Sequence, residues 1–401
     1  MAASVVFRNI EGRQGYWGAL ALVGVFLALG AAAFFTMEHA GHWITGMDNQ
    51  TVWGLPHVFA VFLIVAASGA LNVASTASVF GKKIYKPLAP LSALLALALL
   101  AGGLAVLVLD LGRPDRLIVA ATTYNFKSIF ALNIILYSGF FGIVGAYLWF
   151  MMERRMQPYS HAAGIAAFIW RLTLTTGTGS IFGFLVAREA YDTALLAPMF
   201  IVFSFAYGTA IYLIVLVAAC AADGRPLGSR LLDRLTHLLG VFVAGSFYFT
   251  VVFHLTNLYI AKTHGIERFV LLDGGVHTTL FWLGQVGIGY VLPLLLIFSP
   301  GSMSRGRVLT ASALVVLGGL AQMYVTIIGA QAWPLDLFPG YEVKSSFFDG
   351  EVHSYVPSGW ELMLGVGGFA VAAAAVVVAL RVLRLLPERL DDESAAAWET
   401  H

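Results

Sequence analysis

Ten mainly apolar segments, each about 20 or more residues long, set the strongest limit on how this chain folds. Segments of that length match the hydrocarbon thickness of a bilayer, where a spanning backbone must satisfy its hydrogen bonds within a helix or a closed barrel. Because 59% of the 401 residues are hydrophobic and only 11% are charged, the protein cannot cover a soluble globular surface. We predict an all-α polytopic membrane protein, a single integral membrane domain over residues 1–401, with about ten transmembrane helices at residues 15–36, 52–80, 88–110, 127–152, 162–187, 194–221, 236–261, 276–299, 308–333 and 359–384.

The distribution of lysine and arginine predicts how these helices are oriented. If the N-terminus lies in the cytoplasm, 15 basic residues fall on the inner side of the membrane and seven on the outer side, while Arg171 lies within the fifth helix. Loops that stay in the cytoplasm carry an excess of lysine and arginine. We therefore predict that both termini are cytoplasmic and that residues 385–401 form a cytoplasmic tail.

Two further properties limit what the protein can bind. Cys220 is its single cysteine, so the sequence lacks the several thiols that iron–sulfur clusters and c-type haem require. The formal net charge is +1 and no basic stripe is present, so we expect no nucleic-acid partner. We also expect no metal, haem or cluster in this chain. If electrons pass through it, another molecule must hold the metal centres.

Polar residues gather near the outer ends of the predicted helices, where charged groups are costly. Each one alone is explained by capping, snorkelling or pairing; Asp110 and Arg113, for example, are expected to form an ion pair that fixes the turn before Pro114. Together, however, they indicate a site for a lipid-soluble ligand with polar carbonyl groups, which describes a quinone. The residues concerned are His57, Asp110, Tyr124, Asn125, Lys127, Arg188, Glu189, His254, Asn257 and Glu361.

Quinone chemistry moves two protons with two electrons, so such a site needs titratable side chains. Imidazole titrates near neutral pH, which makes His57 and His254 the candidate proton-transfer residues, with Glu189 as a third. Arg171 lies deeper and is either a paired structural residue or one step of a proton route. The candidate quinone-binding residues are His57, Asp110, Arg113, Tyr124, Asn125, Lys127 and Arg188.

Two other functions would also place polar residues in a ten-helix protein. A secondary transporter would use them for a substrate pathway, although transporters usually place the site near the midplane and interrupt helices there. A di-haem cytochrome b would need two histidine pairs, and His57 with His254 supplies one pair at most. The crowding of charges in one leaflet favours the quinone site over both.

Three short motifs resemble those of a known family. WGLPH (residues 53–57), LDLGRPDR (109–116) and YNFKS (124–128) are similar in order and spacing to motifs of the NrfD/polysulfide-reductase membrane-subunit family. The likeness extends from about Trp53 to Pro387. The ending PSGWELMLGVGGF (357–369) and the stretch TGTGSIFGFLVAREAYD (176–192) resemble its ten-helix branch, which contains the hydrogenase subunit HybB and, as the nearer likeness, the sulfur-metabolism subunit DsrP. One departure is that Ile129 to Asn133 lack the carboxylate found there in hydrogenase-type relatives.

This resemblance implies a fold and a function. It implies two four-helix bundles, at about residues 52–187 and 194–333, flanked by the first and last helices. It also implies a membrane anchor subunit of a quinone-linked oxidoreductase complex in the bacterial inner membrane, in sulfur metabolism, which is not catalytic in isolation. The subunit would bind menaquinone or ubiquinone near the outer face. Its partners would be a periplasmic ferredoxin-like iron–sulfur subunit and other membrane and cytochrome subunits.

Overall fold

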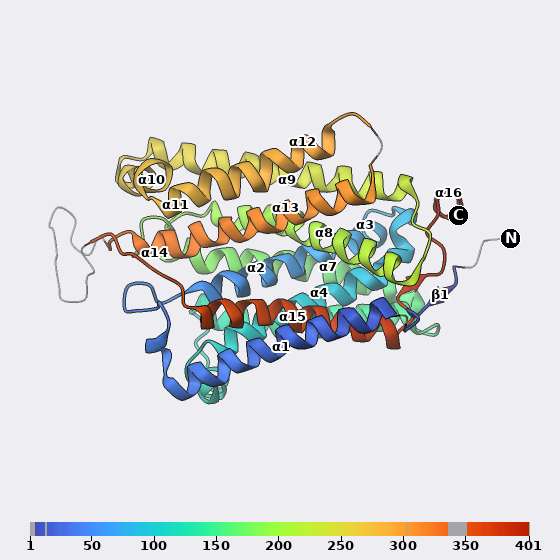
Figure 1. Ribbon diagram of the computed structural model, residues 1–401, viewed down its shortest axis with the longest axis horizontal. Helices are drawn as coiled ribbons and strands as arrows, with labels where there is room; N and C mark the ends of the chain where they lie inside the picture. The colour runs from blue at the N-terminus through green and yellow to red at the C-terminus, as the bar shows by residue number, and fades with distance from the viewer. Residues whose placement is uncertain (1–4, 13, 302, 336–350, 401) are drawn as a thin grey trace.

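The computed structural model describes residues 5–12, 14–301, 303–335 and 351–400. Long helices run side by side along the longest axis of the molecule (Figure 1). The elements of the first half are β1 Phe7–Arg8, α1 Gln14–Ala40, 3-10 helix η1 His42–Ile44, α2 Leu55–Ala70, α3 Asn72–Ser78, η2 Lys83–Leu88, α4 Ala89–Leu109, η3 Pro114–Arg116, α5 Leu117–Thr122, α6 Ile129–Met152, η4 Gln157–Tyr159 and α7 Ser160–Gly183.

The second half contains several π-helical segments, η6, η7 and η8. Its elements are α8 Leu196–Asp223, α9 Ser229–Tyr259, η5 Ala261–Thr263, α10 His264–Arg268, η6 Phe269–Asp273, α11 Val276–Thr279, η7 Leu280–Val291, α12 Leu292–Phe298, α13 Arg305–Tyr324, η8 Val325–Gly329, α14 Ala330–Ala332, α15 Gly359–Val382, β2 Leu386–Pro387 and α16 Asp392–Thr400. Extra-wide turns of this kind are often found beside functional sites.

The helices confirm the predicted all-α membrane fold. Within the described residues, nine helices are long and apolar enough to cross a bilayer. The remaining predicted span is α7, which has 24 residues and packs between α6 and α8 but is less apolar, because it carries Arg171 and many threonines and glycines. Each of the ten predicted segments thus falls on a helix or on a continuous run of helices.

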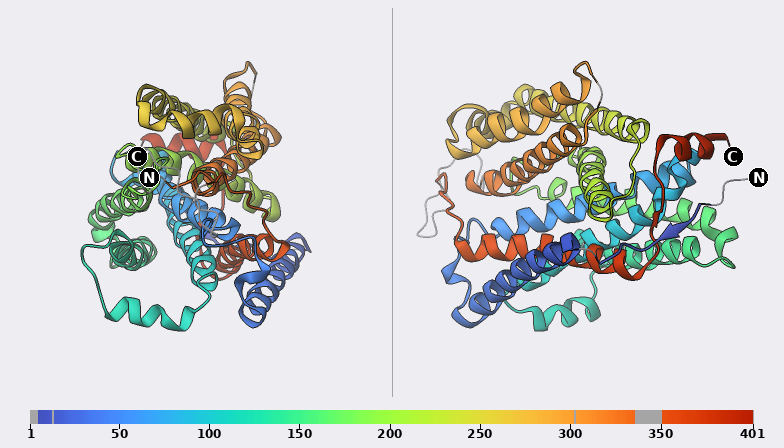
Figure 2. Two further views of the ribbon diagram at one scale, coloured as in Figure 1. Left: turned by 90° about the vertical axis from the view of Figure 1, so that its left-hand side faces the viewer. Right: turned by 45° about the vertical axis from the view of Figure 1, so that its right-hand side comes forward.

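For description we divide the helices into two groups along the predicted boundary between residues 187 and 194. The first bundle consists of α2 with α3, α4, α6 and α7, and the second of α8, α9, η7 with α12, and α13. The two bundles meet where α2 contacts α8 and α13 and where α7 contacts α8. The first and last helices lie together on one side: α1 packs mainly on α15, and α15 packs on α4 and α2 (Figure 2).

Both ends of the chain lie at the same end of the bundle, which we call the terminal face (Figure 1). There β1 pairs with β2 in antiparallel register, Phe7 with Pro387 and Arg8 with Leu386. Arg225, in the turn between α8 and α9, donates hydrogen bonds of 2.9–3.1 Å to four carbonyl groups of these two segments and pairs with Asp223 at 2.7 Å. The opposite end, which we call the far face, carries the start of α2 and the ends of α4 and α9.

The α2 helix is the centre of the molecule. It is apolar on every side and 13 of its residues are buried, as expected for a helix surrounded by other helices. The run is interrupted at Leu71, and the side-chain amide of Asn72, the next residue, donates to Phe205 O and Thr209 Oγ1 of α8, at 3.0 and 2.9 Å. Arg171 of α7 donates to Ser68 O and Asn72 Oδ1 at the same point. These contacts favour a structural role for Arg171.

A close crossing of α2 and α8 joins the two bundles. Gly69 and Gly208 face each other there, and a Cβ atom built on Gly69 would lie 1.5 Å from the carbonyl oxygen of Ser204. Small residues at such crossings allow membrane helices to approach closely.

We therefore expect Gly69→Ala to force α2 and α8 apart and to lower the yield of folded protein. Overpacking of this kind costs about 1–3 kcal/mol or more. Gly142→Ala on α6 is the matched control, because nothing lies within 4 Å of its Cβ position. Monodisperse protein recovered in detergent, measured by size-exclusion chromatography, checks this expectation. Equal recovery of the two variants would contradict it.

Candidate functional site

The predicted site residues all lie toward the far face, but they do not form one cluster. His57 and Asp110 meet in the first bundle, whereas His254 and Asn257 meet Glu267 in the second. Arg188 and Glu189 lie in the segment between α7 and α8. The imidazoles of His57 and His254 therefore face separate carboxylates.

The first cluster consists of Asp110 between two histidines. Asp110 caps the C-terminus of α4, and its side chain is fully buried. The Nδ1 atom of His57, in the first turn of α2, lies 2.9 Å from Asp110 Oδ2. On the other side, Nε2 of His42 lies 3.8 Å from Asp110 Oδ1. A negative charge at a helix C-terminus is disfavoured by the helix dipole, so a positive imidazolium nearby stabilises it.

The turn after α4 explains the spacing of the LDLGRPDR motif. Gly112 has φ +67°, a left-handed conformation that a side chain would strain, and the His42 ring lies 3.3 Å from where a Cβ would stand. This turn directs Arg113 outward, where it binds Asp115 through two hydrogen bonds of 3.0 Å. The predicted Asp110–Arg113 ion pair is therefore wrong. The exposed carboxylate of Asp115 is its actual partner, and it raises the pKa of Arg113.

Aromatic rings form a wall beside His57. The Trp53 ring stacks on the His57 ring with a distance of 6.2 Å between the ring centroids. Its centroid lies 6.1 Å from that of Phe130 and 5.6 Å from that of Phe182. Phe182 is buried, whereas Phe130, at the start of α6, is partly exposed. The cluster thus places an imidazole at the edge of an apolar aromatic surface.

Two groups of hydrogen bonds hold the backbone in front of α2. Gln331 of α14 accepts from Trp53 N and donates to Trp53 O, at 3.0 and 2.9 Å. Arg188, predicted to bind the ligand, donates to the carbonyl groups of Gln331 and Gln50, both at 2.8 Å. Burial lowers the pKa of Arg188 from its ordinary value. The role of this guanidinium in the structure is to fix the entrance to α2.

The second of these groups centres on Glu361, which begins α15. It accepts from Gly46 N at 2.9 Å and from the Tyr355 hydroxyl at 2.5 Å. The same hydroxyl accepts from Leu55 N at 2.7 Å, at the first residue of α2. Burial, with the neighbouring carboxylate, raises the pKa of Tyr355. The last helix thereby helps to position His57, two residues further along.

The YNFKS segment, with α5, forms a bridge from α4 to α6 that stands out from the bundle (Figure 2). Asn125 accepts from Lys127 N at 3.0 Å, and the Tyr124 hydroxyl donates to the carbonyl of Ala131. Ser128 caps α6 by accepting from Ala131 N. Asn125 and Lys127 are exposed, so in this structure the segment starts α6 and is separate from the His57–Asp110 contact.

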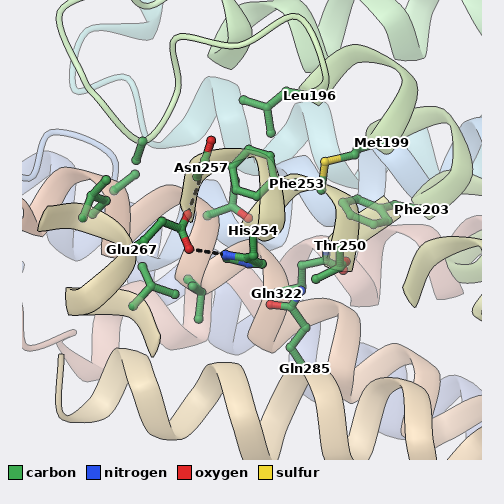
Figure 3. Close-up of a pocket in the computed structure, with 16 residues that line it drawn as sticks. Leu196, Met199, Phe203, Thr250, Phe253, His254, Asn257, Glu267, Gln285 and Gln322 are labelled. Carbon is green, nitrogen blue, oxygen red and sulfur yellow. Dashed lines mark hydrogen bonds and ion pairs between the residues drawn. The ribbon is translucent and has the colours of Figure 1, made fainter. Parts of the chain in front are cut away.

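The second cluster borders a small cavity in the second bundle (Figure 3). His254 Nδ1 lies 2.7 Å from Glu267 Oε2, and Asn257 donates to the other carboxylate oxygen at 2.8 Å. The cavity of about 50 Å³ lies between this pair and Thr250, Gln285 and Gln322. At roughly 10–15 Å³ of such volume per water, it has room for a few waters.

Three residues of these clusters were missed from the sequence. His42 and Glu267 are brought in by loops and short helices, and Gln331 comes from the far end of the second bundle. None of them lies within a motif that would single it out. Glu189, predicted to be catalytic, accepts a hydrogen bond of 3.2 Å from the indole of Trp333.

Comparison with known proteins now decides the family. The sequence model described as "Polysulphide reductase, NrfD" matches residues 43–334, which include the whole of both bundles. The chain belongs to the NrfD family. The segments that the NrfD match covers carry WGLPH, LDLGRPDR and YNFKS, so the resemblance inferred from those motifs is confirmed.

NrfD relatives from several organisms are membrane subunits of redox complexes. The protein is 30% identical over 395 residues to the Hdr-like menaquinol oxidoreductase integral membrane subunit of Archaeoglobus fulgidus, covering 97% of this chain and 99% of the relative. It is 23% identical over 401 residues to a selenate reductase subunit of Mesobacillus selenatarsenatis, covering 88% and 92%. It is 25% identical over 305 residues to a polysulfide reductase polypeptide of Wolinella succinogenes, covering 70% and 95%.

Proposed function

We propose that this protein is the quinone-binding membrane subunit of an oxidoreductase complex, with its quinone site at the His57–Asp110 cluster. The observation that supports this most directly is the imidazole of His57, held by a buried carboxylate at the edge of the Trp53–Phe130–Phe182 wall. An aromatic wall suits a quinone ring, and an imidazole nitrogen suits its carbonyl. The first relative named above is a menaquinol oxidoreductase subunit, and this agrees with the proposal.

The protein's own residues have distinct tasks in this proposal. A bound quinol supplies two electrons and two protons. The Asp110 carboxylate faces Nδ1 of His57, so it favours a proton on Nδ1 and leaves Nε2 to accept one from the ligand. Asp110 then stabilises the imidazolium that results. Trp53 and Phe182 exclude water from one side of the ring, while the partly exposed Phe130 lies toward lipid.

The finer parts of the proposal concern the surroundings of the subunit. We place the terminal face in the cytoplasm of a bacterial cell, because the basic residues are in excess there. An iron–sulfur subunit would then dock on the far face, outside the membrane, in a complex of sulfur metabolism like that of DsrP. Acidic residues in two predicted outer loops support docking on this side: Glu38 and Asp48 in the first, and Asp336, Glu342, Asp349 and Glu351 in the second, of which residues 336–350 lie outside the described residues.

Photolabelling with an azidoquinone tests the position of the site. We expect the label on peptides that contain Trp53, His57 or Phe130, and we expect excess unmodified quinone to suppress it. The residues of the second cavity, from Thr250 to Glu267, are the internal control because that cavity borders the separate His254–Glu267 cluster. Suppressible label confined to the second bundle would move the site, and label that competitor does not reduce would argue against a quinone site.

A further inference from the structure

One polar contact of the first cluster has no role in the function proposed so far. His42 lies on η1, directly after α1, and its side chain is 27% exposed, whereas that of Asp110 is fully buried. The facing atoms, His42 Nε2 and Asp110 Oδ1, are both buried without a hydrogen-bond partner among the described residues, and so are His57 Nδ1 and Asp110 Oδ2, which approach to an ion-pair distance of 2.9 Å. His42 Nε2 and Asp110 Oδ1 are 3.8 Å apart. A small movement of the His42 imidazole would close this gap.

Leaving both atoms unsatisfied has an energetic cost. A buried donor or acceptor without a partner costs about 1–3 kcal/mol, and more if it is charged. A proton on His42 Nε2 would give Asp110 Oδ1 a charge-assisted contact and satisfy both atoms. The two atoms are therefore placed to share a proton when the 3.8 Å gap between them closes.

We propose that His42 is a proton-transfer residue that connects Asp110 with the water at the far face. This inference deepens the function proposed above and rests on it. A proton leaving the ligand passes to His57 Nε2, and His57 releases its Nδ1 proton to Asp110 Oδ2. Asp110 rotates or transfers the proton to His42 Nε2, and the partly exposed ring of His42 gives a proton to bulk water. One proton thus reaches water and Asp110 is again a carboxylate; each imidazole is left with its proton on Nε2 and returns to its starting tautomer by a ring flip or by proton exchange with water, and no electron moves in these steps.

His42 lies in the sequence outside the segment that contains the other residues of the cluster and matches the family. His42 directly precedes residues 43–334, the part that matches the family. It reaches Asp110 only because α1 packs against α15 and because Gly112 leaves room for its ring. The first helix and its loop therefore contribute a group that the two bundles by themselves lack.

The charged groups around His42 come from three elements. Asp110 belongs to α4, Glu38 and His39 to the last turns of α1, and Arg113 to the turn after Gly112. Glu38 and His39 are exposed, and Arg113 is paired with Asp115. Asp110 is thus the buried charge that His42 faces.

The test measures quinol-linked turnover of the purified complex for His42→Ala, with His39→Ala as control because His39 is an exposed histidine in the preceding turn. We expect His42→Ala to lower turnover about 10²-fold, the lower end for loss of a positioned acid–base group, and His39→Ala to leave it unchanged. Added imidazole should enter the exposed space and restore turnover in His42→Ala but not in a His57→Gln variant. His42→Gln should remain slow, because glutamine fills the space without titrating.

Three results separate the ways in which the inference can fail. Normal turnover in His42→Ala would overturn the inference. The inference would also be overturned if His42→Ala were slow, added imidazole did not restore its turnover, and His42→Gln were normal. In that case the His42 side chain would serve only to fill space. If instead the wild-type complex shows neither quinol turnover nor suppressible azidoquinone labelling, the proposed function itself fails. The pH dependence from about pH 5.5 to 8.5, where an ordinary imidazole titrates, is the independent readout, and it should change in His42→Gln.

Discussion

His57→Gln is expected to lower quinol-linked turnover by about 10²-fold or more while the complex still assembles. Glutamine keeps a hydrogen-bonding group near Asp110 but cannot take up a proton, and loss of a positioned acid–base group typically costs that much. Quinone binding should weaken but stay detectable, because the Trp53 wall is intact. Turnover with a soluble electron acceptor and extraction of bound quinone from the same preparation provide the two measurements.

Two controls make the His57 prediction specific. His264→Gln changes an exposed histidine of the far face that contacts the carbonyl of Leu258, and it should behave like the wild type. His254→Gln changes the second cluster and leaves the aromatic wall untouched. If His57→Gln turned over normally in a fully assembled complex while His254→Gln did not, proton transfer would have to be assigned to the His254–Glu267 pair.

Asp110→Asn is expected to lower turnover as much as His57→Gln does, for a different reason. The amide keeps the size of the carboxyl group but removes the negative charge that faces His57 and His42 and the oxygen that is proposed to receive a proton from His57. Removing one member of a buried charged pair also leaves the other uncompensated, which typically costs about 3–5 kcal/mol when both are charged. We expect turnover to fall by about 10²-fold or more and the thermal midpoint of the purified protein to shift.

The matched control for Asp110→Asn lies five residues away. Asp115→Asn makes the same chemical change in the same motif, but its side chain is 62% exposed and its partner, Arg113, is exposed too. Pairs of this kind contribute little to stability. Turnover and thermal midpoint should therefore be near wild type. A loss in Asp115→Asn equal to that in Asp110→Asn would show that the motif acts only through its turn.

Much of the fold could be predicted because the bilayer imposes simple rules. A run of about 20 apolar residues has few alternatives to a helix, so the spans and the polar far face follow from the sequence. The location of His57 near the start of α2 followed from the same count. The lengths of the apolar runs could not predict which residues make contact between helices, since these contacts depend on packing.

The site shows where that limit lies. Asp110 and Arg113 are neighbours in sequence, but Gly112 turns the backbone and sends Arg113 to Asp115, so the partners of the buried Asp110 come from 53 and 68 residues earlier in the sequence. Arg188 has the charge expected of a ligand-binding residue, yet it binds two carbonyl groups across the far face. The pattern of apolar residues predicts neither the partner of Arg113 nor the partners of Arg188.

The pairing of α1 with α15 has a consequence for biosynthesis. The first helix enters the membrane long before the last one is made, and until then it lacks the surface on which it mainly packs. The β1–β2 clasp closed by Arg225 has to wait in the same way for Leu386 and Pro387. Because His42 follows α1, the contact between His42 and Asp110 would be among the last to form. A polypeptide that stops before α15 would lack the helix on which α1 mainly packs, and with it the contact that brings His42 to Asp110.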